Sequence, residues 1–175
     1  MTDDTIFAAV DLWCSNETAA RAAYGDISTW DTSDVTDMSS LFSGKVSCNP
    51  DITKWDTSSV TTMEMMFYEA EAFSGNITKW DTRSVTNMEK MFMHAVSFDG
   101  DLPPWILNRP ENLETMSYGA LAFSRYLCWS LGNSVSMGSD AFTDSSGAWY
   151  CAPTFEPTLS PAPTPLPTLN PWTSV

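Results

Sequence analysis

Residues 52–73 read ITKWDTSSVTTMEMMFYEAEAF, and residues 77–98 read ITKWDTRSVTNMEKMFMHAVSF. The two stretches keep the same order of apolar and polar residues at a spacing of 25. Working outward, residues 27–42 keep this phase, and residues 102–123 keep it in a more divergent form; the marker tryptophans are Trp30, Trp55, Trp80 and Trp105. Repeats of about 20 to 50 residues are typical of proteins in which each unit buries its apolar face against the next one.

Spacing inside the unit predicts its local structure. Ile52, Trp55 and Thr57 fit a short strand with inward-facing Trp and Thr. Apolar residues at positions 63, 66, 67, 70 and 73 have helical spacing, and Thr61 with Glu64 forms a capping box ahead of them. We therefore expect an α/β repeat, a short leucine-rich-repeat-like solenoid. Each 25-residue unit would hold one short parallel strand and one short helix, with the indole rings stacked.

The phase of the 25-residue repeat divides the chain into three regions. Residues 1–26 are predicted to form a helical N-terminal cap, and residues 27–151 a solenoid of four to five repeats with a C-terminal cap. Residues 152–175 carry seven of the eleven prolines and lie outside the repeat phase. Such a Pro/Thr-rich segment is expected to be an extended linker or stalk.

The four cysteines lie at the two ends of the array. Cys14 and Cys48 flank the first unit, where Cys48 takes the position of Phe73 in the second; Cys128 and Cys151 flank the last unit. This placement predicts disulfides Cys14–Cys48 and Cys128–Cys151 in an extracellular protein. The alternative is four reduced thiols.

Other sequence features bear on the compartment and the partners. Asn16 and Asn76 begin Asn-x-Thr sequons, which are candidate glycosylation sites in a secreted protein. The start of the chain does not resemble a signal peptide, so either the protein is cytosolic or the sequence begins inside a longer chain, and the placement of the cysteines favours a module of a larger chain. No apolar run is long enough for a membrane span, so no direct membrane insertion is expected. A net charge of −14, with only eight Lys and Arg residues, argues against nucleic acid.

One polar column is the main candidate site. Asp31, Asp56 and Asp81 are expected to point outward from successive units, with Lys54, Lys79 and Arg83 beside them. The simplest interpretation is that each Asp accepts local hydrogen bonds in an Asx turn. A weaker alternative is Ca²⁺ held by the three carboxylates, and no other cofactor is expected.

Two other functions, catalysis and the ordering of ice or water, are alternatives to binding. A glycosidase needs two carboxylates in different environments, whereas these acids are repeated equivalents, so no catalytic residues are expected. Threonine columns such as Thr32, Thr57 and Thr82 raise the alternative of an ice- or water-ordering protein. His94, the one histidine, is expected to be a partly exposed surface residue.

The motif Ile-x-x-Trp-Asp-Thr-Ser-x-Val-Thr-x-Met-x-x-Met-Phe resembles the 25-residue repeat of BspA-like surface proteins, the Mycoplasma-lipoprotein-type relatives of leucine-rich repeats. The likeness covers residues 27–125 and is strongest in the second and third units. It implies a secreted or cell-surface, non-catalytic module for adhesion or recognition. Its partner would be an extracellular protein or glycan, bound by a monomeric module through the strand face.

Overall fold

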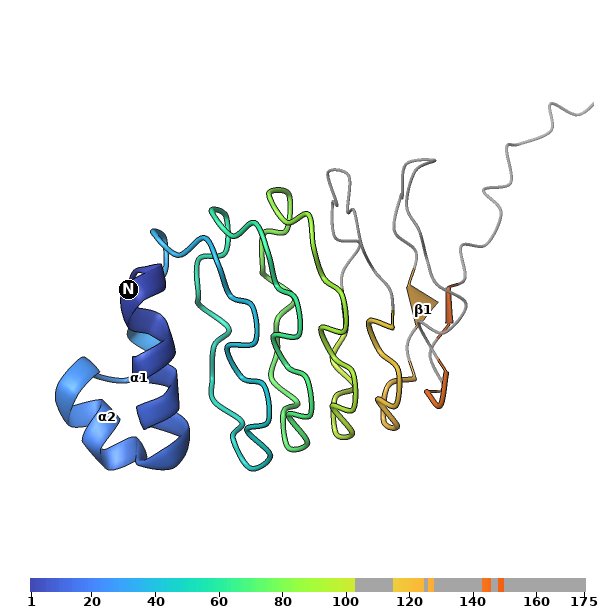
Figure 1. Cartoon of the computed structure of the whole chain (residues 1–175), viewed down its shortest axis with the longest axis horizontal. Helices are drawn as coiled ribbons and strands as arrows, with labels where there is room; N and C mark the ends of the chain where they lie inside the picture. Colours follow the sequence, from blue (N-terminus) through green and yellow to red (C-terminus); the bar gives the residue numbers. More distant parts are fainter. Residues whose placement is uncertain (103–114, 125, 128–142, 146–147, 150–175) are drawn as a thin grey trace, which may run out of the picture.

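A computed structural model describes residues 1–102, 115–124, 126–127, 143–145 and 148–149. Its helices are α1 (Asp3–Ser15), α2 (Glu17–Tyr24) and the short 3-10 helix η1 (Ile27–Thr29). Two-residue strands β1 (Tyr126–Leu127) and β2 (Ala148–Trp149) pair in parallel. In Figure 1 the chain after α1 and α2 winds into coils that lie side by side along the long axis.

The predicted α/β solenoid is wrong. Within residues 1–102 and 115–124 the helices are α1, α2 and η1 alone, and no strand is present there. The predicted helix after Thr61 is absent: the Thr61 amide donates to the Thr36 carbonyl at 2.8 Å, and its hydroxyl donates to the same oxygen at 3.1 Å. The coils of this part of the chain are built from turns and isolated bridges.

Successive tight turns explain why the helical prediction failed. The amide of Met66 donates to the carbonyl of Met63, and the pairs Ala70–Phe67 and Phe73–Ala70 repeat this i→i−3 bond at 3.0–3.2 Å. Both ends of each turn are buried. Turns linked in this way place apolar residues three and four positions apart, which is also the spacing of a helix face.

Non-glycine residues with positive φ determine the type of these turns. Met65 has φ 53° and Glu69 has φ 54°, each at the third position of its turn. A type II turn requires positive φ at that position. In the next unit Lys90 and His94 repeat the conformation with φ 56° and 60°.

Hydrogen bonds between coils replace the predicted parallel strands. Alternate amides of one coil donate to carbonyls 24 residues further along the chain. In the second coil the donor–acceptor pairs, at 2.8–2.9 Å, are Met63–Asn87, Met65–Glu89, Phe67–Met91 and Glu69–Met93. Met66 and Tyr68, which lie between these donors, make turn bonds to Met63 and Met65, so the amides of this segment are paired without extended strands.

The core consists of aromatic columns that run through the stack. The Trp30 and Trp55 rings are stacked at 6.2 Å with a 17° interplanar angle. Two phenylalanine columns lie beside them, with centroids 5.4–5.9 Å apart; the columns are Phe42–Phe67–Phe92 and Phe73–Phe98–Phe123. Buried indoles also tie coils together, because Trp55 Nε1 donates to the Ile27 carbonyl at 2.9 Å and Trp80 Nε1 to that of Ile52 at 3.3 Å. Trp105 lies outside the described residues.

The cap substitutes for a coil that would precede the first one. Asp3 carboxylate oxygens accept from the Thr36 amide at 2.8 Å and from the Thr36 hydroxyl at 2.6 Å. Thr61 makes the matching two bonds to a backbone carbonyl. Ile6, Val10 and other apolar residues of α1 are buried in the same core as the coils. The cap therefore satisfies both the polar and the apolar edges of the first coil.

The predicted disulfide Cys14–Cys48 is confirmed, with a Cα–Cα distance of 5.3 Å. It joins α1 to the first coil at the start of the Phe73–Phe98–Phe123 column. The second predicted disulfide, Cys128–Cys151, and the stalk at 152–175 lie outside the described residues.

Candidate functional site

The predicted binding residues lie along successive coils, and we call Asp31, Lys54, Asp56, Lys79, Asp81 and Arg83 the charged strip. Asp31 and Asp56 are exposed and Asp81 is partly exposed, whereas the tryptophan and threonine beside each Asp are buried. The sequence thus placed the inward and outward side chains correctly.

Asx turns hold the three carboxylates of the strip. Asp31 Oδ1 accepts from the Ser33 amide at 3.1 Å and its hydroxyl at 2.7 Å, and Asp56 Oδ1 accepts from Ser58 at 2.9 and 2.6 Å. Asp81 Oδ1 accepts from the Arg83 amide at 3.0 Å. The Asx-turn interpretation is therefore confirmed.

These bonds keep the acids ionised. The serine hydroxyls and then the serine amides lower the pKa of Asp31 and of Asp56, and the Arg83 guanidinium, followed by its amide, lowers that of Asp81. Desolvation, and then charge repulsion from Asp31 and Asp81, oppose the lowering of the Asp56 pKa, but the hydrogen bonds outweigh them. A general acid needs a raised pKa, and no carboxylate of the strip has one.

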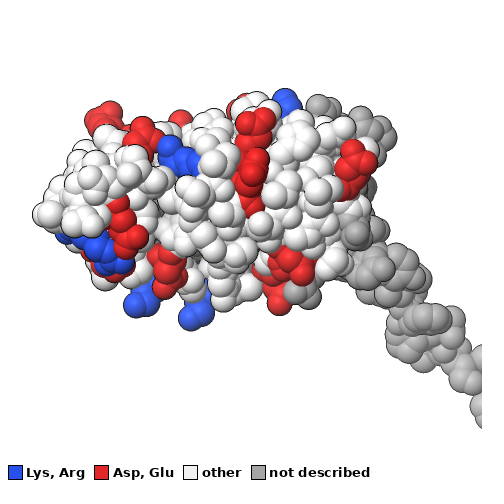
Figure 2. Space-filling view, turned by 90° about the horizontal axis from the view of Figure 1, so that it is seen from below, with Lys and Arg blue, Asp and Glu red and all other residues white. Residues whose placement is uncertain are grey.

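The basic residues of the strip differ in their pairing. Arg83 Nε donates to both oxygens of Asp81, at 2.9 and 3.1 Å. Lys54 and Lys79 are exposed and make no hydrogen bond or ion pair within the described part of the chain. Figure 2 shows one face on which acidic side chains form separate groups along the length of the stack and basic ones are few.

The calcium alternative gains no support from the described part of the chain. Among the residues placed there, no three His, Cys, Asp or Glu side chains are grouped closely enough to hold a metal ion. Nor does any helix among them have the length and apolar character to cross a membrane.

A second column of Asx turns, which was not predicted from the sequence, lies directly before each Ile-x-x-Trp segment. Asp26 accepts from Ser28, Asp51 from Thr53, and Asn76 from Thr78. Ser28 and then Arg21 hold the pKa of Asp26 at about 2. The 25-residue spacing of these acceptors was visible in the sequence and could have identified them.

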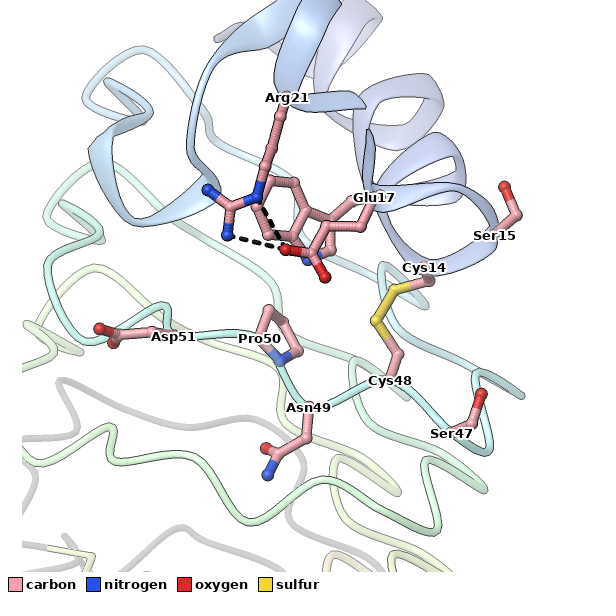
Figure 3. Close-up of a pocket in the computed structure, with 10 residues that line it drawn as sticks. Cys14, Ser15, Glu17, Arg21, Ser47, Cys48, Asn49, Pro50 and Asp51 are labelled. Carbon is pink, nitrogen blue, oxygen red and sulfur yellow. Dashed lines mark hydrogen bonds and ion pairs between the residues drawn. A yellow bond between two sulfur atoms is a disulfide. The ribbon is translucent and has the colours of Figure 1, made fainter. Parts of the chain in front are cut away.

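A pocket of about 460 Å³ lies where the cap meets the first coil. One side comes from the corner between α1 and α2, with Trp13, Glu17 and Arg21, and the other from residues 47–51. Figure 3 shows Arg21 and Glu17 facing Asn49, Pro50 and Asp51, with the disulfide between the two segments. Sequence reasoning missed this pocket because it arises only when the cap docks.

Arg21 organises the cap side of the pocket. Its guanidinium lies 4.7 Å from the centroid of the Trp13 ring and forms ion pairs with Glu17, at 2.7 Å, and with Asp26. The Asp26 carboxylate, followed by Glu17, raises the pKa of Arg21. Across the pocket, hydrogen bonds from Thr53 lower the pKa of Asp51, so its carboxylate is ionised.

The remaining sequence candidates have local structural roles. Asn16 is exposed and its side chain caps α2 by accepting from the Ala19 amide at 3.1 Å. Asn76 is also exposed, in its Asx turn. His94 is partly exposed, as expected, and its ring lies edge-on to Tyr118 at 5.5 Å.

The threonine columns do not form a free hydroxyl surface. Thr32 and Thr57 are buried and donate to the carbonyls of Asp56 and Asp81 at 2.9 and 3.0 Å. Thr61 and Thr86 are exposed, but their hydroxyls bond to carbonyls of the preceding coil.

Stacked 25-residue coils, aromatic columns and a disulfide-linked helical cap define a repeat protein. The chain belongs to the family described as "Mycoplasma protein of unknown function, DUF285", whose model matches residues 14–129. No curated protein and no solved structure matches this chain.

Proposed function

We propose that the protein is a non-catalytic recognition or adhesion module of the BspA-like type. It would bind an extracellular protein or glycan through the charged strip. Its proposed place is outside the cell, as a monomeric module of a larger chain. Family membership and the Cys14–Cys48 disulfide support this proposal, since disulfides persist in oxidising compartments.

One observation carries the choice of surface. Lys54 and Lys79 occupy equivalent positions on neighbouring coils, exposed and without a hydrogen bond or ion pair among the described contacts, and each lies two residues before an Asp that an Asx turn holds in place. The stacked coils fix the backbone positions of these residues before a partner arrives, so the backbone needs little ordering on binding.

The strip also limits the kind of partner. It carries both acids and bases, so a partner with both charges, or a hydroxyl-rich one, fits better than a uniformly charged polymer. Exposed charges of this kind contribute more to association rate and selectivity than to affinity.

A protein array and a glycan array, each probed with and without chelator, would test the proposal. The double variant Lys54→Glu/Lys79→Glu should lose the partners that the unmodified protein binds, and raised salt should weaken the binding. Lys90→Glu, a charge change outside the strip, is the control and should retain them. Equal binding by all three proteins would refute the role of the strip.

A further inference from the structure

We propose that the pocket between the cap and the first coil binds a neutral saccharide unit. This site is separate from the charged strip, although Asp51 on its rim is close enough to Lys54 for the lysine charge to lower the Asp51 pKa. A volume of about 460 Å³ falls within the range of about 300–1,000 Å³ usual for small-molecule sites.

The pocket is held together before any ligand binds. The Cys14–Cys48 disulfide links its two sides, and Lys45 Nζ pairs with Asp11 of α1 at 2.6 Å nearby. Arg21 lies over Trp13 and forms ion pairs with Glu17 and Asp26. The side chains therefore need little rearrangement to receive a ligand.

The chemistry of the lining is mixed in a way that suits hydroxyl groups. Arg21 has five N–H donors, and its bonds to Glu17 and Asp26 leave some of them for a ligand. Glu17 and Asp51 each carry a second carboxylate oxygen, and Ser47 adds a hydroxyl. A sugar hydroxyl donates and accepts at once, so adjacent hydroxyls can bond to the guanidinium and to a carboxylate together.

Charged ligands fit less well. A lysine or arginine side chain would offer only donors and would face the Arg21 guanidinium, while an anion would face the carboxyl groups of Glu17 and Asp51. An apolar ligand finds little surface, because Arg21 covers the indole of Trp13. A neutral polyhydroxylated ring avoids all three conflicts.

The test is an NMR titration of the ¹⁵N-labelled full chain with glucose, galactose, mannose, N-acetylglucosamine and their disaccharides. At least one sugar should shift the amides of Ser47, Asn49 and Asp51, with a dissociation constant on the order of 1 mM, as expected for a small polar ligand. Asp51→Asn should weaken that binding about tenfold, because it removes the charge on a hydrogen-bond acceptor.

Asp51→Asn is expected to fold, since Asn76 holds the equivalent position and its Oδ1 accepts from Thr78 at 3.0 and 2.7 Å. Asp56→Asn is the matched control: it changes an Asx carboxylate outside the pocket and should leave the shifts of the pocket amides unchanged. Lys79→Glu, which changes the strip one coil away from Asp51, should also retain sugar binding, so failure of the strip and failure of the pocket are distinguishable.

Three outcomes would overturn the proposal. The first is that no sugar shifts these amides at about 20 times the expected dissociation constant. The second is that Asp51→Asn and Asp56→Asn weaken binding equally. The third is that a lysine-rich peptide shifts the pocket amides while the sugars do not, which would assign the pocket to a cationic peptide.

Discussion

The disulfide between the cap and the first coil should make a large contribution to stability. We consider the double variant Cys14→Ser/Cys48→Ser, which removes the cross-link and leaves no unpaired thiol at either position. The bond closes a loop with a sequence separation of 34 residues. In the chain-entropy model, a loop of this length restricts the unfolded state by about 13 cal/mol/K, or about 4 kcal/mol at 25 °C.

That loss is a large share of the stability of a typical domain, which is about 5–15 kcal/mol. Urea denaturation followed by tryptophan fluorescence would measure it, because Trp13, Trp30 and Trp55 are buried. The variant should unfold at a lower urea concentration, and its α1 amides should exchange with solvent faster than those of the Phe67 coil.

Lys45→Ala provides the comparison, because it removes the Lys45–Asp11 ion pair between the same two segments. Exposed ion pairs contribute about 0–1 kcal/mol, so this variant should change stability only slightly. If the double serine variant lost less than about 1 kcal/mol, or no more than Lys45→Ala, the cap would not be a cooperative part of the fold.

Three other predictions follow from the coil geometry. Thr57→Val should lower the free energy of unfolding by about 1–2 kcal/mol in chemical denaturation, because a carbonyl of the next coil loses a buried hydrogen-bond donor. Thr61 is exposed, so Thr61→Val should lower it by less than about 0.5 kcal/mol. Equal losses would contradict the burial of Thr57. Gly75→Ala should destabilise by about 1–3 kcal/mol, because the added Cβ would lie 2.9 Å from the Phe73 ring, and an unchanged melting temperature would contradict that close contact. The pKa of Asp26 is lowered to about 2 in the folded protein, whereas that of an unfolded Asp is near 4, so the Asp26 hydrogen bonds contribute their full stability above pH 4. The free energy of unfolding should therefore fall as the pH drops from 4 towards 2. An Asp26 pKa near 4, measured by NMR titration of its carboxyl group, would refute this.

The repeat and its inward-facing residues could be predicted because the buried residue types recur with the repeat period. Trp55, Thr57 and Val60 recur at intervals of 25 residues, and the structure buries all three. The Cys14–Cys48 pairing was also accessible, because a cysteine replaces an in-phase phenylalanine. These predictions required only the phase of the repeat.

The local conformation could not be predicted in the same way. A helix and a series of linked turns bury residues with the same spacing of three and four, so the apolar pattern after Thr61 fits both. Positive φ at Met65 and Glu69 decides between them, and neither residue type favours that conformation. Bonds to the next coil stabilise it, and these depend on contacts 24 residues away.

Of the two candidate sites, one depends on the repeat phase and the other on contacts between distant segments. The charged strip could be read from the sequence, because its residues are phased with the tryptophans. The pocket could not, since Arg21 and Asp51 come together only through docking of the cap.

The most direct test of the stacked-coil fold is to detect its hydrogen bonds by NMR scalar couplings across them. The Phe67 amide should couple to the carbonyl of Met91, with which it forms a 2.9 Å bond between coils. In a helix the same amide would couple to the carbonyl of Met63, four residues earlier. Coupling to Met91 is the predicted result, and coupling to Met63 would contradict the fold described here.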